Sequence, residues 1–149
     1  MKKLFILTLP LLLLSCTDYG EMVTYNGTDV YYKDGATQTD ADKLGAYLEE
    51  SEFADGNEKS VQIVKNESGT WVFRMVVQEG AEEGDDTMFK LAALGISMGA
   101  FDGEPVDVDL CDNLFTTLKT IPYGFSDDES EDTEDTEDEI LSSDSTAVD

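Results

Sequence analysis

Two neighbouring stretches with a period of two residues constrain the fold of this chain most strongly. In residues 60–65 and again in residues 70–78, apolar side chains such as Val61, Ile63 and Phe73 occupy every second position. Alternation of β-branched and aromatic side chains is typical of a strand with one face against a core. The residues between the two stretches, 66–69, have the composition of a turn, so we expect a β-hairpin.

A first helix is predicted before this hairpin. We expect it to begin with Thr39 as its N-cap, because two acidic residues follow near the positive end of the helix dipole. The Asp55-Gly56 pair should end it near Phe53. Its apolar side chains fall on one stripe that would face a core: Ala41, Leu44, Tyr47 and Leu48.

A second helix is predicted from residues 85–87 to about Ala100. Apolar residues occupy nearly all sides of this helix, so we expect it to be well buried or covered by a partner. Gly95 and Gly99 weaken it by about 1 kcal/mol each relative to alanine. Because they lie four residues apart on one face, they would permit the close approach of another element.

Further strands complete an α+β fold. Residues 29–33 form a firm strand, with a candidate partner in residues 22–25 before the Asn26-Gly27 turn. Residues 106–111 and 114–121 flank another tight turn. We therefore predict a mainly antiparallel sheet of about five strands in the order β-α-β-β-α-β-β, with both helices on one face.

A faint internal repeat relates the two halves of this domain. With an offset of 47 residues, Leu44 corresponds to Leu91, and Asp55-Gly56 corresponds to Asp102-Gly103. Each half would be a helix, an Asp-Gly stop and a hairpin. Duplication of a helix–hairpin unit and convergence on a simple pattern explain this equally well.

The composition changes at Ser126. Residues 126–139 are an acidic low-complexity run that buries nothing and repels itself, so we predict a disordered tail over residues 126–149. The folded domain is then expected to span residues 22–125.

The other end of the chain has the features of a targeting segment. Lys2 and Lys3 precede an apolar run, residues 4–14, that is shorter than the roughly 20 residues needed to span a bilayer. The run ends in Leu13-Leu14-Ser15-Cys16, with apolar or small residues before the cysteine. This N-terminus resembles the lipobox signal peptides of bacterial lipoproteins.

The resemblance implies that residues 1–15 are removed and that Cys16 carries diacylglycerol and a fatty acyl group such as palmitate. Residues 16–21 would then form a lipidated leader, since two or more acyl chains give stable anchoring. Thr17, rather than Asp, favours the outer membrane under the enteric sorting rule. The implied location is the cell envelope, on its periplasmic or surface face. An ordinary secretory signal is the alternative.

The composition excludes several classes of function. A net charge of −25 repels nucleic acid and an anionic bilayer surface, so the lipid must provide the membrane contact. The absence of histidine excludes Ser-His-Asp and Cys-His sites and histidine-bound metals. Asp109 and Asp112 disfavour a thiolate at Cys111, so we interpret this cysteine as structural. We predict no catalytic residue, no cofactor beyond the lipid and no metal site.

The sheet face opposite the helices is the predicted partner surface. It could be solvated, bind another protein or support a dimer, and its candidate residues are Gln62, Arg74, Asp107, Asp109 and Lys119. We predict a non-enzymatic envelope protein that serves as an interaction or structural module. The first alternative is weak capture of calcium or other cations by the acidic tail, because carboxylates are hard oxygen ligands. A hydrolase that uses buried carboxylates is the second alternative.

Overall fold

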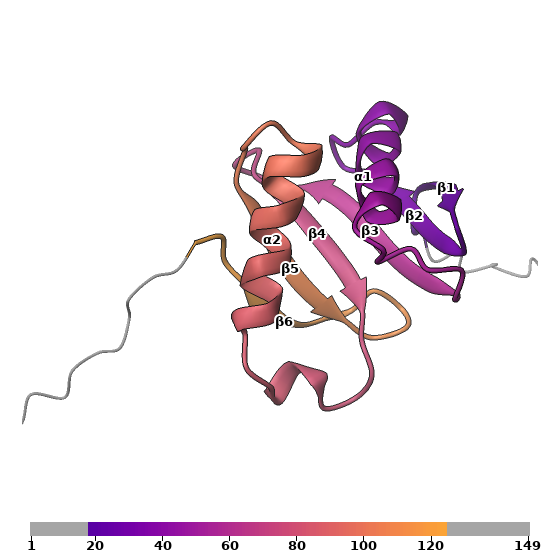
Figure 1. Cartoon of the computed structure of the whole chain (residues 1–149). Coiled ribbons are helices and arrows are strands. Elements are labelled where there is room, and N and C mark those ends of the chain that lie inside the picture. Colours follow the sequence, from indigo (N-terminus) through magenta and orange to yellow (C-terminus); the bar gives the residue numbers. More distant parts are fainter. Residues whose placement is uncertain (1–17, 125–149) are drawn as a thin grey trace, which may run out of the picture.

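The computed structural model describes residues 18–124, in which six strands and two α-helices form one α+β domain (Figure 1). The predicted signal peptide, Cys16 and the acidic tail lie outside the described residues. The elements follow in the order β1 (Glu21–Tyr25), β2 (Thr28–Tyr32), α1 (Gln38–Glu50), β3 (Lys59–Lys65), β4 (Trp71–Val76), the 3₁₀ turn η1 (Ala81–Glu83), α2 (Thr87–Ala100), β5 (Val106–Cys111) and β6 (Thr117–Ile121).

The sheet is mixed and has six strands, which corrects the prediction of about five strands in a mainly antiparallel sheet. Its spatial order is the order of the sequence, β1 to β6. The three hairpins pair antiparallel, whereas β2 with β3 and β4 with β5 pair parallel. Each parallel pair is joined by a helix that returns the chain to the end of the sheet from which it came. The sixth strand is β1, which pairs with β2 through the Asn26-Gly27 turn.

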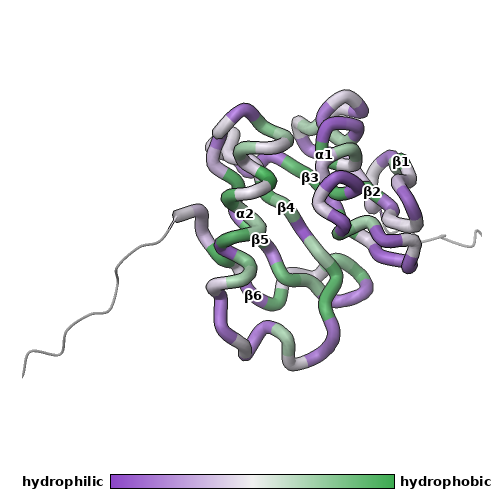
Figure 2. The backbone as a smooth tube through the Cα atoms, viewed as in Figure 1, coloured by the Kyte–Doolittle hydropathy of each residue, from purple (hydrophilic) through white to green (hydrophobic). Residues whose placement is uncertain are grey.

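Both helices cover one face of the sheet, as predicted, and one core lies between them and the strands (Figures 1 and 2). Side chains at alternate positions of the inner strands point into it, so that Val30, Val61, Met75 and Leu110 are neighbours across the sheet. Helix α1 adds Ala41, Leu44 and Leu48, and α2 adds Ala93, Ile96 and Ala100. The period-two and helical patterns in the sequence therefore locate most of the core correctly.

The two helical crossovers have opposite hands. Strands β2 and β3 point one way and β4 and β5 point the other, while the sheet grows in a single direction from β1 to β6. With both helices on one face, one crossover is necessarily of the rare left-handed kind. Two copies of one duplicated helix–hairpin unit would have crossovers of the same handedness, because rotating a unit in space does not change its handedness. The topology therefore disagrees with duplication and favours convergence.

Helix α1 begins two residues earlier than predicted and ends at Glu50 rather than near Phe53. Its N-cap is Thr37, whose side chain accepts from the backbone N–H of Asp40, while the Asp40 carboxylate accepts from the backbone N–H of Thr37 at 2.9 Å. This reciprocal capping box satisfies two N–H groups at once, which explains why the helix begins there. At the other end, Glu52 has a left-handed φ of 61° that takes the chain out of the helix.

Candidate functional site

Helix α2 exposes large apolar side chains to solvent along one side. The exposed fractions are 71% for Met88, 67% for Met98, 49% for Leu91 and 40% for Leu94. We call these four side chains the α2 apolar face. Single exposed apolar residues are ordinary, but a contiguous set on one helix marks a binding surface in many proteins.

The buried side of α2 is made of smaller residues. Ala93, Ser97 and Ala100 are buried with Ile96, and the Ser97 hydroxyl donates to the Glu104 carbonyl at 2.7 Å. Small side chains on the inside let the helix lie close to the sheet, while the bulk of its apolar surface points outward. The helix is therefore not well buried as a whole, although the sequence predicted burial or a covering partner.

The two glycines of α2 provide a contact for α1. A Cβ at Gly95 would overlap the hydroxyl end of the Tyr47 side chain, and a Cβ at Gly99 would overlap its ring. The absence of side chains at these positions thus seats Tyr47 against the α2 backbone. This confirms the expectation that the glycine pair permits a close approach.

An apolar groove of about 320 Å³ lies between the last turns of α1 and the first turns of α2, and Tyr47 borders it where this side chain packs on the α2 glycines. We call it the helix groove. Leu48 and Phe53 line its α1 side, Phe73 and Met75 form its floor, and Met88, Phe89 and Ala92 line its α2 side. Met88 belongs to both the groove and the α2 apolar face, so the two meet at this side chain. The sequence indicated the α2 part of this surface, but nothing local marks Phe53 as a groove residue.

Acidic residues are concentrated in the sequence at the end of α1 and just before α2. Residues 49–52, at the end of α1, and residues 82–86, before α2, contain seven carboxylates and no lysine or arginine. The last turn of α1 carries no basic residue to balance the negative end of its dipole. Asp86 is bonded to Lys119 at 2.7 Å, and Lys90 contributes to a lowered pKa of Asp85, which is caused first by hydrogen bonds from Thr87.

The predicted partner face is occupied by a network of its own. Arg74 donates to the Gln62 side-chain oxygen at 2.5 Å and to the Phe115 carbonyl at 2.6 Å, and its Nε lies 3.5 Å from the Asp109 carboxylate. Asp109 also accepts from the hydroxyls of Thr117 and Thr120. The structure thus brings Gln62, Arg74 and Asp109 together, with their hydrogen-bonding capacity used within the domain.

Three aromatic side chains cover part of this second face of the sheet. Tyr19, Tyr31 and Phe115 meet edge to face, with ring centroids 5.5–5.8 Å apart. The Gln62 amide donates to the Tyr19 carbonyl at 2.8 Å. Phe115 comes from a loop in which Asp112 accepts backbone bonds from Leu114 and Thr116, bonds that lower the pKa of its carboxyl group. The strand predicted from residue 114 therefore begins only at Thr117.

The other two predicted partner residues lie apart from this network. Asp107 accepts from the backbone N–H of Tyr123 at 2.9 Å. Lys119 pairs with Leu110 across the sheet and so lies on the helix face, where it donates to the Glu82 carbonyl and to Asp86. Its placement on the second face was wrong. Ile121, two residues later in β6 and buried in the core, is the signal that shows which face Lys119 takes.

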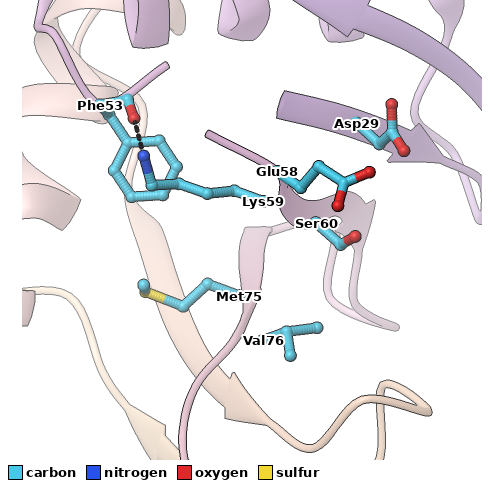
Figure 3. A pocket seen from close by; sticks show the side chains of 7 residues that line it. All are labelled: Asp29, Phe53, Glu58, Lys59, Ser60, Met75 and Val76. Carbon is cyan, nitrogen blue, oxygen red and sulfur yellow. Dashed lines mark hydrogen bonds between the residues drawn. The ribbon is translucent and has the colours of Figure 1, made fainter. Parts of the chain in front are cut away.

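A second cavity, of about 520 Å³, opens at one end of the sheet (Figure 3). Asp29, Glu58 and Ser60 line it together with Met75 and Val76. Lys59 at its edge donates to the Phe53 carbonyl at 2.8 Å and also binds Asp55. Carboxylates and apolar side chains line this cavity together, so the hydrolase alternative is not excluded by the shape of the surface alone. Glu58 is exposed to water and Asp29 accepts from Thr24 at 2.7 Å, so neither has the dry surroundings of a general acid.

Cys111 is buried on the second face of the sheet, and its thiol is free. Burial is the first cause of its raised pKa, which disfavours the reactive thiolate. Within residues 18–124, no three carboxylate or thiol groups are arranged to hold a metal ion. In the same part of the chain, neither helix has the length and apolarity required to cross a membrane.

Comparison with known proteins places the domain in a family. A family model described as the AF_1994_N N-terminal domain matches residues 22–122, from β1 to the residue after β6. No curated protein and no solved structure matches the chain. The match covers more than half of the sequence and the whole sheet with both helices. The chain therefore belongs to the AF_1994_N family and carries its N-terminal domain.

Proposed function

We propose that this protein is a non-enzymatic binding module, tethered to a bacterial membrane by lipid on Cys16, that binds its partner through the α2 apolar face. The observation that carries the proposal is the exposure of Met88, Leu91, Leu94 and Met98 on one helix. Burying one such side chain stabilises a complex by about 1.5–3 kcal/mol. A partner that covers these side chains would remove their apolar surface from water, and this gain is the reason for proposing one.

The second face supports this choice of surface. The sequence predicted this face as the partner surface. In the structure, Gln62, Arg74 and Asp109 instead bond to one another and lie under Tyr19 and Phe115. Binding there would first require this cover to open. The α2 apolar face needs no rearrangement, which makes it the better candidate.

The tether would also orient the domain. Only two residues separate Cys16 from Tyr19, which is docked on the second face of the sheet, so a lipid on Cys16 would lie within about 11 Å of that face. The Lys33 ammonium donates to the carbonyl of Asp18 and holds the same segment. The second face would then rest near the bilayer, and the two helices would point away from it toward a partner.

Location and cation binding belong to this proposal as secondary points. We propose an envelope location, with the outer membrane favoured by Thr17. The alternative function, weak calcium capture by the acidic tail, concerns residues outside those described. Calorimetry on the full chain and on a chain ending at Phe125 would separate the two functions, since cation binding should disappear with the tail while partner binding persists.

Site-specific crosslinking in bacteria tests the binding surface. A photo-reactive side chain at Leu91 or at Met98 of the full chain is expected to join the same segment of one envelope protein, identified by mass spectrometry. The matched control is Leu114, an exposed leucine in the β5–β6 loop, which should give no such product. Equal products from all three positions, or none from either α2 position, would contradict the proposal.

A further inference from the structure

We infer that the partner segment is a cationic amphipathic helix, which lies along the helix groove and the α2 apolar face. This inference rests on the proposed function and names the chemistry of its partner. It starts from three properties of the same surface, which are its shape, its apolar residues and the charges at its end.

The shape suits a helix. Lys43 of α1 lies 3.9 Å from Asp102, just after α2, while Ser51 and Met88 share the groove at the other end, so the two helices run antiparallel. Helix α2 has 14 residues and is therefore about 21 Å long. A partner helix of about four turns would match this length, with apolar anchors at positions i, i+3 or i+4, and i+7.

The apolar residues suit such a partner as well. Met88 and Met98 have unbranched, polarisable side chains that adapt to different anchors, and Leu91 lies between them. The groove beside Met88 offers Phe53 and Phe89 as walls for one larger anchor. This combination of a helical groove and flexible methionines is a recurring way to bind amphipathic helices.

The charges determine which kind of amphipathic helix fits. Residues 49–52 and 82–86, which are close in sequence to the groove residues Ser51 and Met88, contain seven carboxylates. Glu49 lies toward Tyr25 and Glu82 lines a separate cavity, so the carboxylates nearest the groove in sequence are Glu50, Glu52, Asp85 and Asp86. Glu49 and Glu50 stand at the C-terminus of α1, where the helix dipole disfavours acidic side chains. A sequence that keeps such a local conflict usually has a functional reason for it. Lysine or arginine from a partner would resolve the conflict.

The same charges disfavour the other occupants. A second copy of the chain would bring the same carboxylates to the interface, and the two copies would repel each other. An anionic bilayer surface is repelled for the same reason. Lys43 and Lys119 already bind Asp102 and Asp86, so basic groups of the domain offset only part of the acidic excess.

Binding of designed peptides tests the inference on the full chain in a lipid nanodisc. One 14-residue helical peptide carries leucines on one face and lysines elsewhere, a second has glutamates in place of the lysines, and a third scrambles the first. We expect the lysine peptide to bind at least about 100-fold more tightly than the other two, with an affinity that falls as salt increases.

Variants of the chain locate the site. Leu91→Lys combined with Met98→Lys should weaken the lysine peptide at least about tenfold, while the matched control Leu114→Lys leaves it unchanged. A chain with Glu50→Gln, Glu52→Gln and Asp85→Asn should bind more weakly and with less dependence on salt. Circular dichroism of each variant confirms that it is folded before its binding is compared.

Three results would overturn the inference. The first is equal affinity for the lysine and glutamate peptides. The second is self-association that Leu91→Lys abolishes, which would identify a second copy as the occupant. The third is crosslinking from Leu91 to an envelope segment without basic residues, in which case the proposed function stands and this inference fails. Absence of any crosslink from Leu91 and Met98 would instead remove the proposed function itself.

Discussion

The ring of Tyr19 packs edge to face against the ring of Phe115, with centroids 5.5 Å apart. The two residues come from opposite ends of the domain, before β1 and before β6. Their contact closes the sheet face opposite the helices and covers the hydrogen bond between Arg74 and Gln62. The first described residues are therefore part of the fold.

Loss of the Tyr19 ring should destabilise the whole domain. We expect Tyr19→Ala to lower the free energy of unfolding by about 1–3 kcal/mol, because it removes two aromatic contacts and admits water to the Gln62–Arg74 pair. Urea denaturation of the full chain measures this, with Tyr19→Phe as the control that keeps the ring. Equal stability of Tyr19→Ala and Tyr19→Phe would show that the ring does not hold the face closed.

Removal of the Arg74 guanidinium should cost more than removal of a surface lysine. The side chains of Arg74 and Asp109 are only 18% and 14% exposed, so Arg74→Ala would leave a largely buried carboxylate without its cation, with only the hydroxyls of Thr117 and Thr120 as donors. We expect a loss of about 2–4 kcal/mol. The matched control is Lys43→Ala, which breaks the exposed pair with Asp102 and should cost no more than about 1 kcal/mol. Similar losses in the two variants would contradict the network described here.

The contact of Tyr47 with the α2 glycines can be tested by a double-mutant cycle. Gly99→Ala alone should destabilise the chain by about 1–3 kcal/mol, because the new methyl group overlaps the Tyr47 ring. In a Tyr47→Ala background the same change should be neutral or stabilising, since alanine favours a helix by about 1 kcal/mol over glycine. Denaturation midpoints of the four chains give the coupling, and additive effects would show that the two residues do not touch.

The ion pair of Asp55 with Lys59 should contribute to stability only above acidic pH. Hydrogen bonding from Lys59 is the first cause that lowers the pKa of Asp55 to about 2 in the folded chain, from an ordinary value of 3.8. A carboxyl group with a lowered pKa stabilises the fold above its unfolded pKa and loses that effect as the pH falls to its folded pKa. Asp55→Asn should therefore lower the urea midpoint clearly at pH 6 and much less at pH 2.

A control separates this pair from the general effect of charge. Glu67→Gln removes one negative charge from the exposed β3–β4 loop and should leave the midpoint of the acidic chain unchanged or slightly raised at pH 6. If Asp55→Asn and Glu67→Gln behave alike across the pH range, the ion pair has no measurable role.

Much of the fold could be predicted from the sequence because its strands and helices have clear periods. Val61, Ile63 and Phe73 alternate into the core as expected, and Leu44 and Leu48 form the inner stripe of α1. The Asn26-Gly27 pair forms a turn with positive φ at both residues, as its composition indicated. Local chemistry fixes these features, so the sequence alone reveals them.

Other features depend on contacts between distant parts of the chain. The parallel pairing of β2 with β3 and of β4 with β5 follows from strand order, which no local pattern records. The closure of the second face by Tyr19 and Phe115 joins residues from the two ends of the domain. The start of α1 is different, because the Thr37-x-x-Asp40 capping box is a local pattern in the sequence and marks Thr37, rather than Thr39, as the N-cap.

Only part of the candidate site could be predicted from the sequence. The all-round apolar pattern of α2 predicted a helix that is either well buried or covered by a partner, and the exposure of Met88, Leu91 and Met98 rules out burial within the described domain. The choice of Gln62, Arg74 and Asp109 as a partner face could not foresee that these three groups bond to one another. Polar side chains on one strand face look alike in sequence whether they are free or paired.

We propose that this domain works from a membrane to which Cys16 tethers it. The intact mass of the full chain isolated from bacterial envelopes, combined with mass spectrometry of its N-terminal peptide, tests this tether. We expect a chain that begins at Cys16 and carries diacylglycerol and a fatty acyl group on that residue. A chain whose Cys16 is an unmodified thiol, recovered in the soluble fraction, would contradict it.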